Sequence, residues 1–191
     1  MKKGLLIVLS GPSGVGKGTV IKELMKNDDL KLSYSISMTT RKPRNGEVDG
    51  VNYFFVDRDT FLKAIDDGEL LEHAEFVGNM YGTPVSYVEK LRNEGRNVLL
   101  EIEVQGAMQV KKKCPDALSI FIIPPSMEEL ASRIRGRNSE PEEIVQQRLD
   151  KAKKEMEMVT QYKYVVCNDD VILASDIISA IIKLHMQIKS N

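Results

Sequence analysis

The sequence predicts an α/β fold in which a doubly wound parallel sheet is covered by helices. Its apolar runs are continuous rather than alternating, as in strands that are buried on both faces of a sheet. Helical patterns separate or follow these runs, which is the order of parallel α/β units. A glycine-rich segment joins the first run to the first helix, where such folds bind phosphate. The strand-like runs cover residues 5–9, 98–102, 118–123 and 164–166.

The first strand, at 5–9, leads into the segment Gly11-Pro12-Ser13-Gly14-Val15-Gly16-Lys17 and then into a helix that opens over 19–26. The spacing is that of the G-x-x-x-x-G-K motif, in the strand–loop–helix context that the motif requires. Backbone N–H groups of such a loop can surround a phosphate chain, and glycine allows the close approach. The loop therefore predicts a site for a nucleoside triphosphate, bound by Gly11, Pro12, Ser13, Gly14, Val15, Gly16, Lys17, Gly18 and Thr19.

One position departs from the motif. The residue after Lys17 is Gly18 in place of the usual Ser or Thr that binds magnesium, and Thr19 comes one place later. The Gly-Lys-Gly-Thr ending resembles that of adenylate kinases and some other nucleotide kinases. It favours a small-molecule kinase over a GTPase switch, and it leaves a direct protein contact to magnesium open.

The middle of the chain interrupts the strand–helix alternation. Residues 33–84 hold short strand-like pieces, turns and a small helix at 60–67, and we interpret them as an insertion that covers the phosphate loop. A helix at 85–94 is expected to end at Gly95, since glycine readily takes the left-handed conformation after a helix. Neither this insertion nor residues 133–148 have enough apolar sequence to form an independent domain.

The second half predicts three further helices. Ser126-Met127-Glu128-Glu129 has the spacing of a capping box and opens one of them. Apolar residues at three-to-four spacing predict a helix from 142 to about 160 and another over 177–188. Residues 133–148, dense in Arg, Glu, Ser and Gly, are interpreted as a mobile surface flap. The whole chain, 1–191, is thus one domain with a core of 1–32, 85–132 and 149–191.

Composition narrows the possible partners. The 191 residues include 27 basic and 28 acidic ones, for a net charge of −1, so no global attraction to nucleic acid is expected. Cys114 and Cys167 have no metal-ligand spacing and are interpreted as reduced thiols of a cytoplasmic protein. No apolar stretch is expected to approach the length needed to span a membrane, and the short apolar run after Met1-Lys2-Lys3 is rejected as a secretion signal. A homo-oligomer stays open.

The block Ser37-Met38-Thr39-Thr40-Arg41-Lys42-Pro43-Arg44 is the most specific part of the sequence, and with it the chain resembles guanylate kinases. The resemblance covers nearly the whole chain and implies the phosphate-loop nucleoside-monophosphate-kinase fold, with 33–84 as the GMP-binding region and 133–148 as the lid. It continues through Gly46 to Tyr53, Leu71 to Phe76, Gly78 to Thr83, Glu101 to Gly106 and Asn168-Asp169-Asp170.

The resemblance also implies how the acceptor is held. Arginine forks and phenolic hydroxyls would bind the phosphate of GMP. Glu72 would accept hydrogen bonds from guanine N1–H and N2–H, whereas adenine presents an acceptor there. Ser37 and Thr83 would contact the base edge. The GMP-binding set is Ser37, Arg41, Arg44, Tyr53, Glu72, Tyr81, Thr83 and Glu103.

The implied reaction is ATP + GMP ⇌ ADP + GDP, with dGMP as a second acceptor. The attacking phosphate oxygen is already anionic, so positioning and charge stabilisation carry the reaction. Asn168 would contact the adenine side, and Glu101 would orient Mg²⁺ directly or through water. His73 is interpreted as a packing residue. The catalytic set is Lys17, Arg133, Arg137 and Arg148.

Two alternatives come from other classes. One is a non-enzymatic guanylate-kinase-like interaction module of the kind found in membrane-associated scaffolds; the intact Gly16-Lys17 pair and the lid arginines argue against it. The other is a kinase for a different monophosphate, such as AMP. Glu72 and the block from Ser37 to Arg44 argue against that second alternative.

Overall fold

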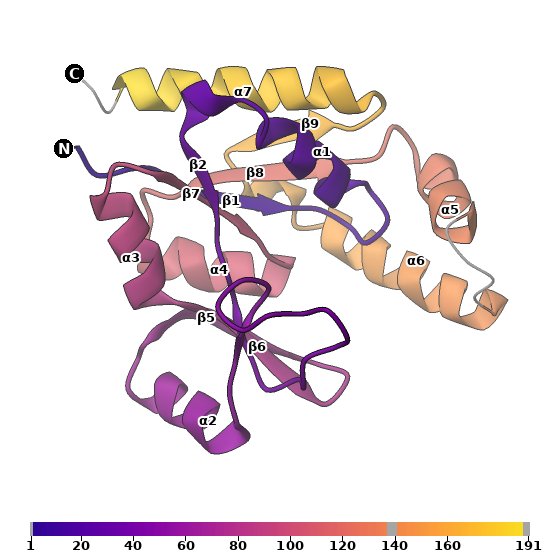
Figure 1. The fold of residues 1–191 in the computed structure, drawn as a ribbon. Coiled ribbons are helices and arrows are strands. Elements are labelled where there is room, and N and C mark those ends of the chain that lie inside the picture. Colours follow the sequence, from indigo (N-terminus) through magenta and orange to yellow (C-terminus); the bar gives the residue numbers. More distant parts are fainter. Residues whose placement is uncertain (1, 137–140, 189–191) are drawn as a thin grey trace.

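The computed structural model describes residues 2–136 and 141–188 (Figure 1). Its main sheet has five strands in the order β2-β7-β1-β8-β9, and every neighbouring pair is parallel. The four predicted runs are confirmed as strands of this sheet. The strands are β1 (Leu6–Ser10), β2 (Leu32–Tyr34), β7 (Asn97–Glu101), β8 (Leu118–Ile123) and β9 (Tyr164–Cys167).

The block that begins at Ser37 was expected to follow a short strand, but the place of that strand, β2, in the main sheet was not predicted. Strand β2 is three residues long, too short for an apolar run to stand out, and it joins the sheet only by pairing with β7. It extends past residue 32, where the sequence places the start of the insertion. The main sheet therefore takes in Ser33 and Tyr34, and Tyr34 is carried to the carboxyl edge of the sheet.

Helices cover both faces of the main sheet, α1 and α7 on one and α3 and α4 on the other (Figure 1). The alternation along β1 explains how: Ile7 and Leu9 belong to the cluster that includes α1 and α7, while Leu6 and Val8 belong to the cluster that includes α3 and α4. All four side chains are buried, as in strands that are covered on both sides. The helices are α1 (Lys17–Leu24), α3 (Val85–Asn93), α4 (Val104–Lys113) and α7 (Val171–Ile188).

Helix α7 corrects the view that no segment has the length of a membrane span. Its 18 residues, with a mean hydropathy of 1.6, are long and apolar enough by length and composition alone. Ala174, Ile178 and Ile182 are fully buried on one face of the helix. Apolar residues on the rest of its surface are exposed, namely Ile172, Leu173, Ile177, Leu184 and Ile188. The helix begins at Val171, six residues before the predicted start, and the Asp170 carboxylate accepts a hydrogen bond from Leu173 N at 2.8 Å.

The insertion forms a small lobe below the main sheet, on the side of α3 and α4 (Figure 1). It contains a four-stranded sheet in the order β4-β3-β6-β5 and one helix that packs on a cluster of Phe61, Ala64, Leu70 and Met80. The elements are β3 (Met38–Thr39), β4 (Phe54–Phe55), α2 (Arg58–Asp66), β5 (Leu70–Phe76) and β6 (Asn79–Pro84).

Helices α5 (Met127–Gly136) and α6 (Glu142–Met156) form an arm at the right of the main sheet in Figure 1. Ser126 Oγ accepts from Glu129 N at 3.1 Å, which confirms the predicted start of α5. The described part of the segment predicted as a surface flap is mostly helical, because α5 and α6 extend into it. The helix predicted to reach about residue 160 ends at Met156, and a short 3₁₀ turn follows at Val159–Gln161.

Candidate active site

The phosphate loop is held between the end of β9 and helix α5. Gly14 and Gly16 have positive φ angles of 89° and 95°, which favour glycine. A Cβ atom on Gly16 would lie 2.6 Å from Asn168 Nδ2, and one on Gly14 would lie 2.7 Å from Ile134 Cγ1. Val15 between them is fully buried. The loop is thus fixed by backbone conformation and close packing, and its first turn leads directly into α1.

Lys17 begins α1 and turns back over the loop. Its Nζ donates to Gly11 O at 2.6 Å and to Pro12 O at 3.3 Å. Burial lowers the pKa of Lys17, and the nearby carboxylates of Glu101, Glu155 and Glu103 act in the opposite direction. A partly buried ammonium surrounded by carbonyls and carboxylates can interact strongly with a phosphate chain.

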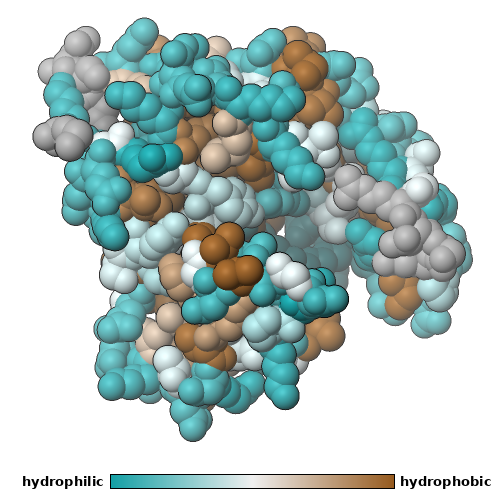
Figure 2. Space-filling view, viewed as in Figure 1, coloured by the Kyte–Doolittle hydropathy of each residue, from teal (hydrophilic) through white to brown (hydrophobic). Residues whose placement is uncertain are grey.

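Two cavities meet in front of this loop. The first, of about 590 Å³, is lined by the loop together with Tyr34, Tyr53, Glu101, Glu103 and Glu155. It opens where the surface is hollowed between the lobe and the arm (Figure 2). The second, of about 260 Å³, lies on the lobe side and contains Glu72. Both cavities share a wall, so a molecule in one would meet a molecule in the other across it. The shared wall is Tyr34, Tyr53, Glu101, Ile102 and Glu103.

Glu72 is the buried acidic group of the second cavity, with 5% of its surface exposed. Its Oε1 accepts from Thr83 Oγ1 at 2.7 Å. Burial raises the pKa of Glu72, and the Thr83 hydroxyl partly opposes that rise. Ser37 lines the same cavity, as predicted for a base contact. Thr83 does not line the cavity and is 1% exposed, so its hydroxyl lies behind Glu72 and orients the carboxylate.

Arg41 lines neither of the two cavities, but it lies beside Tyr53 of their shared wall. Its guanidinium forms a two-pronged ion pair with Glu47, at 2.8 and 2.9 Å, and stands 5.2 Å from the centre of the Tyr53 ring. Tyr53 and Tyr81 pack edge to face at 6.1 Å between ring centres. Three of the four predicted phosphate-binding residues are therefore gathered. Arg44, the fourth, is exposed, and its backbone N donates to Glu47 at 2.7 Å.

Glu47 was missed as a site residue, although it pairs with Arg41. Hydrogen bonds from Arg41 lower the pKa of Glu47 to about 2, with further support from the Arg44 backbone N–H. Its position three residues after Arg44 was the available signal, because a carboxylate so close to two arginines is well placed to pair with them.

Charged residues at positions i, i+3 and i+7 of helix α6 reach the phosphate loop and the neighbouring Glu103. Arg148 Nη2 donates to Ser13 Oγ at 3.0 Å. Lys151 Nζ donates to both oxygens of Glu103, at 2.8 and 3.0 Å. Burial raises the pKa of Glu155, whereas the charge of Lys17 and the Ser13 backbone N–H act to lower it. One face of α6 thus follows the wall of the first cavity. Lys151 and Glu155 were not predicted, because a charged stripe on a helix is most often a solvated face.

The remaining arm arginines lie apart. Arg133 Nη1 donates to Asn168 O at 2.8 Å, and its Nε donates to Glu129 at 2.9 Å. Arg133 therefore lies on the β9 side of the loop, with Gly14, Thr19 and Asp169, around a third cavity of about 360 Å³. Arg137, predicted as catalytic, lies outside the described residues.

Asn168 supports the phosphate loop from below. It is 2% exposed, and its Nδ2 donates to Val15 O at 2.7 Å, while Oδ1 is buried with no hydrogen-bond partner among the described residues. The side chain thus holds the buried residue of the loop. Its backbone carbonyl accepts from Arg133, so this residue also links the loop to the arm.

Glu101 ends β7 at the carboxyl edge of the sheet, where open α/β sheets gather ligands. Its Oε2 accepts from the Tyr34 hydroxyl at 3.0 Å, a contact that was not predicted because the place of β2 in the main sheet was not. Within the described ranges, no three side chains of His, Cys, Asp or Glu converge as a metal cage. The carboxylate of Glu101 fits Mg²⁺, because this ion usually relies on one or two carboxylates together with phosphate oxygens and water.

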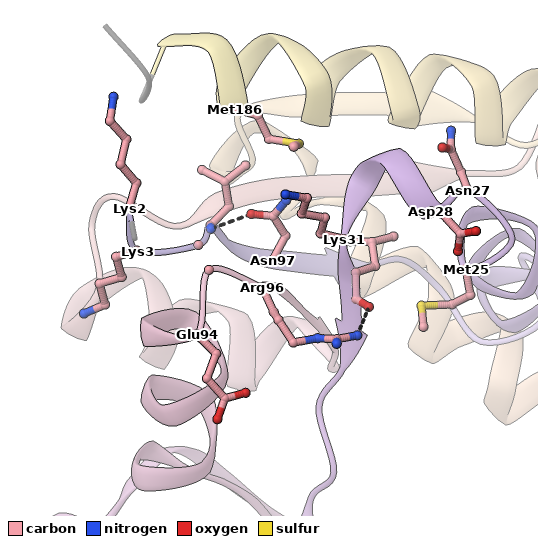
Figure 3. A pocket seen from close by; sticks show the side chains of 14 residues that line it. Lys2, Lys3, Met25, Asn27, Asp28, Lys31, Glu94, Arg96, Asn97 and Met186 are labelled. Atoms are coloured by element: carbon pink, nitrogen blue, oxygen red, sulfur yellow. Dashed lines mark hydrogen bonds between the residues drawn. The ribbon is translucent and has the colours of Figure 1, made fainter.

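Another cavity, of about 620 Å³, lies at the opposite, amino-terminal end of the parallel strands (Figure 3). Basic side chains line it, but Lys3 pairs with Glu89, and Arg96 donates to Ser33 Oγ and to Leu32 O. Asn97 is tied to Leu5 N at 2.8 Å. These groups connect neighbouring chain segments, so the cavity at the carboxyl edge is the better candidate for chemistry.

The two histidines have structural surroundings. The backbone N and O of His73 bond the side-chain amide of Gln109 at 3.1 and 2.9 Å, which joins β5 to α4. His185 Nε2 lies 3.0 Å from the Tyr164 hydroxyl. Neither histidine lines the two cavities in front of the phosphate loop.

Comparisons with known proteins agree with this geometry. The sequence model of the guanylate kinase family matches residues 3–184. A curated guanylate kinase of Bacillus cereus is 60% identical over 95% of this chain and 88% of its own length. One of Mycoplasma mycoides is 61% identical over 90% of this chain and 58% of its own length. The solved guanylate kinase of Anaplasma phagocytophilum is 38% identical, covers 96% of this chain and 87% of that one, and has a TM-score of 0.74.

The match along almost the whole sequence agrees with a phosphate loop that carries a lysine and with a neighbouring pocket that holds a buried glutamate. This chain therefore belongs to the guanylate kinase family, the nucleoside monophosphate kinases that act on GMP.

Proposed function

We propose that the chain transfers the γ-phosphoryl group of ATP to GMP, giving ADP and GDP, and that dGMP is a second acceptor. The observation that carries this proposal is the shared wall between the phosphate-loop cavity and the Glu72 cavity. With a triphosphate on the loop and a monophosphate nucleotide beside Glu72, the two phosphate groups would face each other across Tyr53 and Glu101.

On the ATP side, backbone N–H groups from Gly11 to Thr19 would bind the phosphate chain, and Lys17 would hold the β- and γ-phosphates. Lys17 Nζ reaches two loop carbonyls, so a small rotation would bring it to phosphate oxygens. Asn168 would meet the adenine side and already supports the loop through Val15 O. Arg148 reaches Ser13 and would stabilise charge on the transferring group, as would Arg133 and Arg137.

On the acceptor side, the attacking atom is a phosphate oxygen of GMP, so no general base is needed. Arg41, Arg44, Tyr53 and Tyr81 would hold that phosphate and align it with the transferred group. Arg41 is held by Glu47 and stacked against Tyr53, which limits its conformations before the phosphate arrives. Catalysis would then rest on alignment and on charge stabilisation.

Base choice would rest on Glu72. Its ionised carboxylate would accept from guanine N1–H and N2–H, with Glu103 supplementing it and Ser37 and Thr83 completing the set. Adenine offers an unprotonated N1 on that edge and would leave the buried carboxylate unpaired. Sites that leave buried polar groups unpaired can discriminate by roughly 10⁴-fold.

Magnesium would enter with ATP. Glu101, at the cavity wall, would hold it directly or through water, and Tyr34 fixes one oxygen of that carboxylate. When bound, Mg²⁺ supplies neutralisation of charge on the phosphate oxygens. We also propose a cytoplasmic place in purine nucleotide metabolism, since both cysteines are free thiols and both substrates are nucleotides.

The test is a coupled ADP-release assay with ATP, Mg²⁺ and GMP, dGMP, AMP, UMP or dTMP as acceptors. ADP and GDP should form with GMP, more slowly with dGMP, and only at background rate with the others. No diphosphate product with GMP would refute the activity and favour the interaction module. Faster turnover with AMP would refute the assigned role of Glu72.

A further inference from the structure

The carboxylate of Glu72 rests against the first turn of α4, at Gly106. A Cβ atom on Gly106 would lie 2.5 Å from Glu72 Oε2, 3.1 Å from Cδ and 3.3 Å from Cγ. Those are the three nearest atoms, and all belong to the Glu72 side chain. The carboxylate therefore occupies the volume that any other residue at position 106 would fill.

Glu72 is thus held on two sides. Thr83 Oγ1 donates to Oε1 at 2.7 Å from β6, and Gly106 makes room for Oε2 from α4. Gly106 also lines the Glu72 cavity. We propose that Gly106 is a specificity-determining positioning residue, which sets where the Glu72 carboxylate meets the guanine edge. This inference rests on the proposed function and deepens it, because it concerns selection of the acceptor at the same site.

The geometry separates this role from a role in folding. In Gly106→Ala the colliding atoms are the far end of a flexible side chain, so Glu72 can turn away at little cost to the fold. Alanine also favours a helix more than glycine does, and Gly106 lies inside α4. Stability should therefore hold or rise, while the carboxylate leaves the position that recognises guanine.

Gly82 shows the opposite case. A Cβ atom there would lie 2.9 Å from the backbone O of Glu72, 2.9 Å from Leu70 Cδ1 and 3.1 Å from Phe61 Cζ. Backbone and core cannot move aside as a side-chain tip can, so Gly82→Ala is expected to lower the melting temperature. The two glycines flank the same glutamate, yet only the one on α4 meets solely its side chain.

The experiment compares steady-state kinetics and melting temperatures of the unmodified protein, Gly106→Ala, Glu72→Asp and the double variant. Gly106→Ala should raise KM for GMP by roughly tenfold to a hundredfold, which is the range of a lost polar contact to the base, and should leave KM for ATP within about twofold. Its melting temperature should be equal or higher. Lys112→Ala, on the exposed face of α4, is the matched control and should change none of these values.

Glu72→Asp is the background that tests the contact, because its shorter side chain withdraws the carboxylate from the space that the alanine fills. In that background Gly106→Ala should change KM for GMP by less than about threefold, a strong departure from additivity. Equal increases in both KM values, a lower melting temperature for Gly106→Ala, or additive effects in the double variant would each overturn the inference. Absence of GDP formation by the unmodified protein would instead refute the proposed function.

Discussion

The phosphate loop and the Glu72 pocket meet at one wall but are built by different means. The loop is a continuous segment whose backbone groups face the cavity, and its glycines fit between Asn168 and Ile134. The pocket is assembled from side chains that are far apart in the sequence: Ser37 precedes β3, Glu72 lies on β5 and Gly106 lies on α4. Binding of phosphate thus depends on local backbone, whereas recognition of the base depends on tertiary packing.

Their charges are balanced differently as well. Lys17 is partly buried, and three carboxylates oppose the lowering of its pKa by burial. Burial raises the pKa of Glu72, and this rise is opposed chiefly by the Thr83 hydroxyl and then by the charge of Lys113. Lys113 Nζ donates to Leu70 O. A buried carboxylate with so little compensation gains most from hydrogen-bond donors brought by a ligand. The comparison predicts that changes at the loop affect turnover and changes at the pocket affect acceptor affinity.

The largest effect is expected for Lys17→Ala, which removes the mobile positive charge of the loop. The turnover number should fall by about 10² to 10³-fold, because charge stabilisation at the transferring group is lost. Single-turnover rates measured by rapid quench would report the chemical step. Lys22→Ala, which lines the same cavity further along α1, is the comparison variant and should lose far less. A near-normal single-turnover rate for Lys17→Ala would contradict the role of the lysine.

Glu72→Gln should raise KM for GMP by roughly 100-fold and leave KM for ATP within about twofold. The amide keeps the shape of the side chain but replaces one acceptor by a donor, which faces the donors of guanine. Isothermal titration with GMP and with ATP, each alone, would measure the two affinities separately. Comparable losses for both nucleotides would remove the distinction between the two regions.

A smaller effect is expected from pH. Because burial raises the pKa of Glu72, its charge is lost at a higher pH than that of an ordinary glutamate. Once the pH falls below that pKa, KM for GMP should rise by about tenfold per pH unit. The phosphate of GMP also titrates on acidification, with a pKa of about 6. The difference between the profiles of the unmodified protein and Glu72→Gln isolates the glutamate, and parallel profiles would refute the assignment.

The raised pKa of Glu72 also affects the stability of the fold: the charged carboxylate favours binding of GMP but destabilises the folded protein. A carboxylate whose pKa is higher in the folded state destabilises the fold above its unfolded pKa, about 4.3. Glu72→Gln should therefore have an equal or higher melting temperature at pH 7, and this gain should disappear below pH 4. Thermal unfolding followed by circular dichroism at both pH values would show it.

The smallest effect is expected for Lys151→Ala, which releases Glu103 from its ion pair with α6. Both side chains are partly exposed, so stability should change by less than about 1 kcal/mol. If Glu103 supplements Glu72 at the base, its release should lower KM for GMP by about two- to threefold. Lys153→Ala, whose ion pair lies on α6 itself, provides the control. A higher KM for GMP in Lys151→Ala would show that the ion pair holds Glu103 in place for the substrate.

Several elements could be predicted because their signals are local. The run at 118–123 became β8 with the same bounds, and the capping residue Ser126 marked the start of α5. The place of strand β2 in the main sheet could not be predicted, since its three residues carry no periodicity and only pairing with β7 puts them there. Helix α4 was also not predicted, because its apolar positions are interrupted by Gly106 and followed by three lysines.

The site divides in the same way. Glu72, Ser37, Tyr53 and Tyr81 were named from a resemblance and are found around one cavity. Glu47 was missed although its short spacing from Arg41 and Arg44 was a local signal. Lys151 and Glu155 were missed because only the folded chain brings them to Glu103 and to the phosphate loop. Thr83 was expected at the base edge, yet its hydroxyl lies behind Glu72.

By itself, the sequence determined the phosphate loop, the parallel core and the family, because each depends on consecutive residues whose conformation follows from local chemistry. Only the tertiary structure decided which side chains surround Glu72, how α6 reaches Ser13 and why position 106 has no side chain. The physical reason is distance along the chain: burial and close contact between residues 72, 83 and 106 arise when the lobe and the core pack together, and no local pattern records that packing.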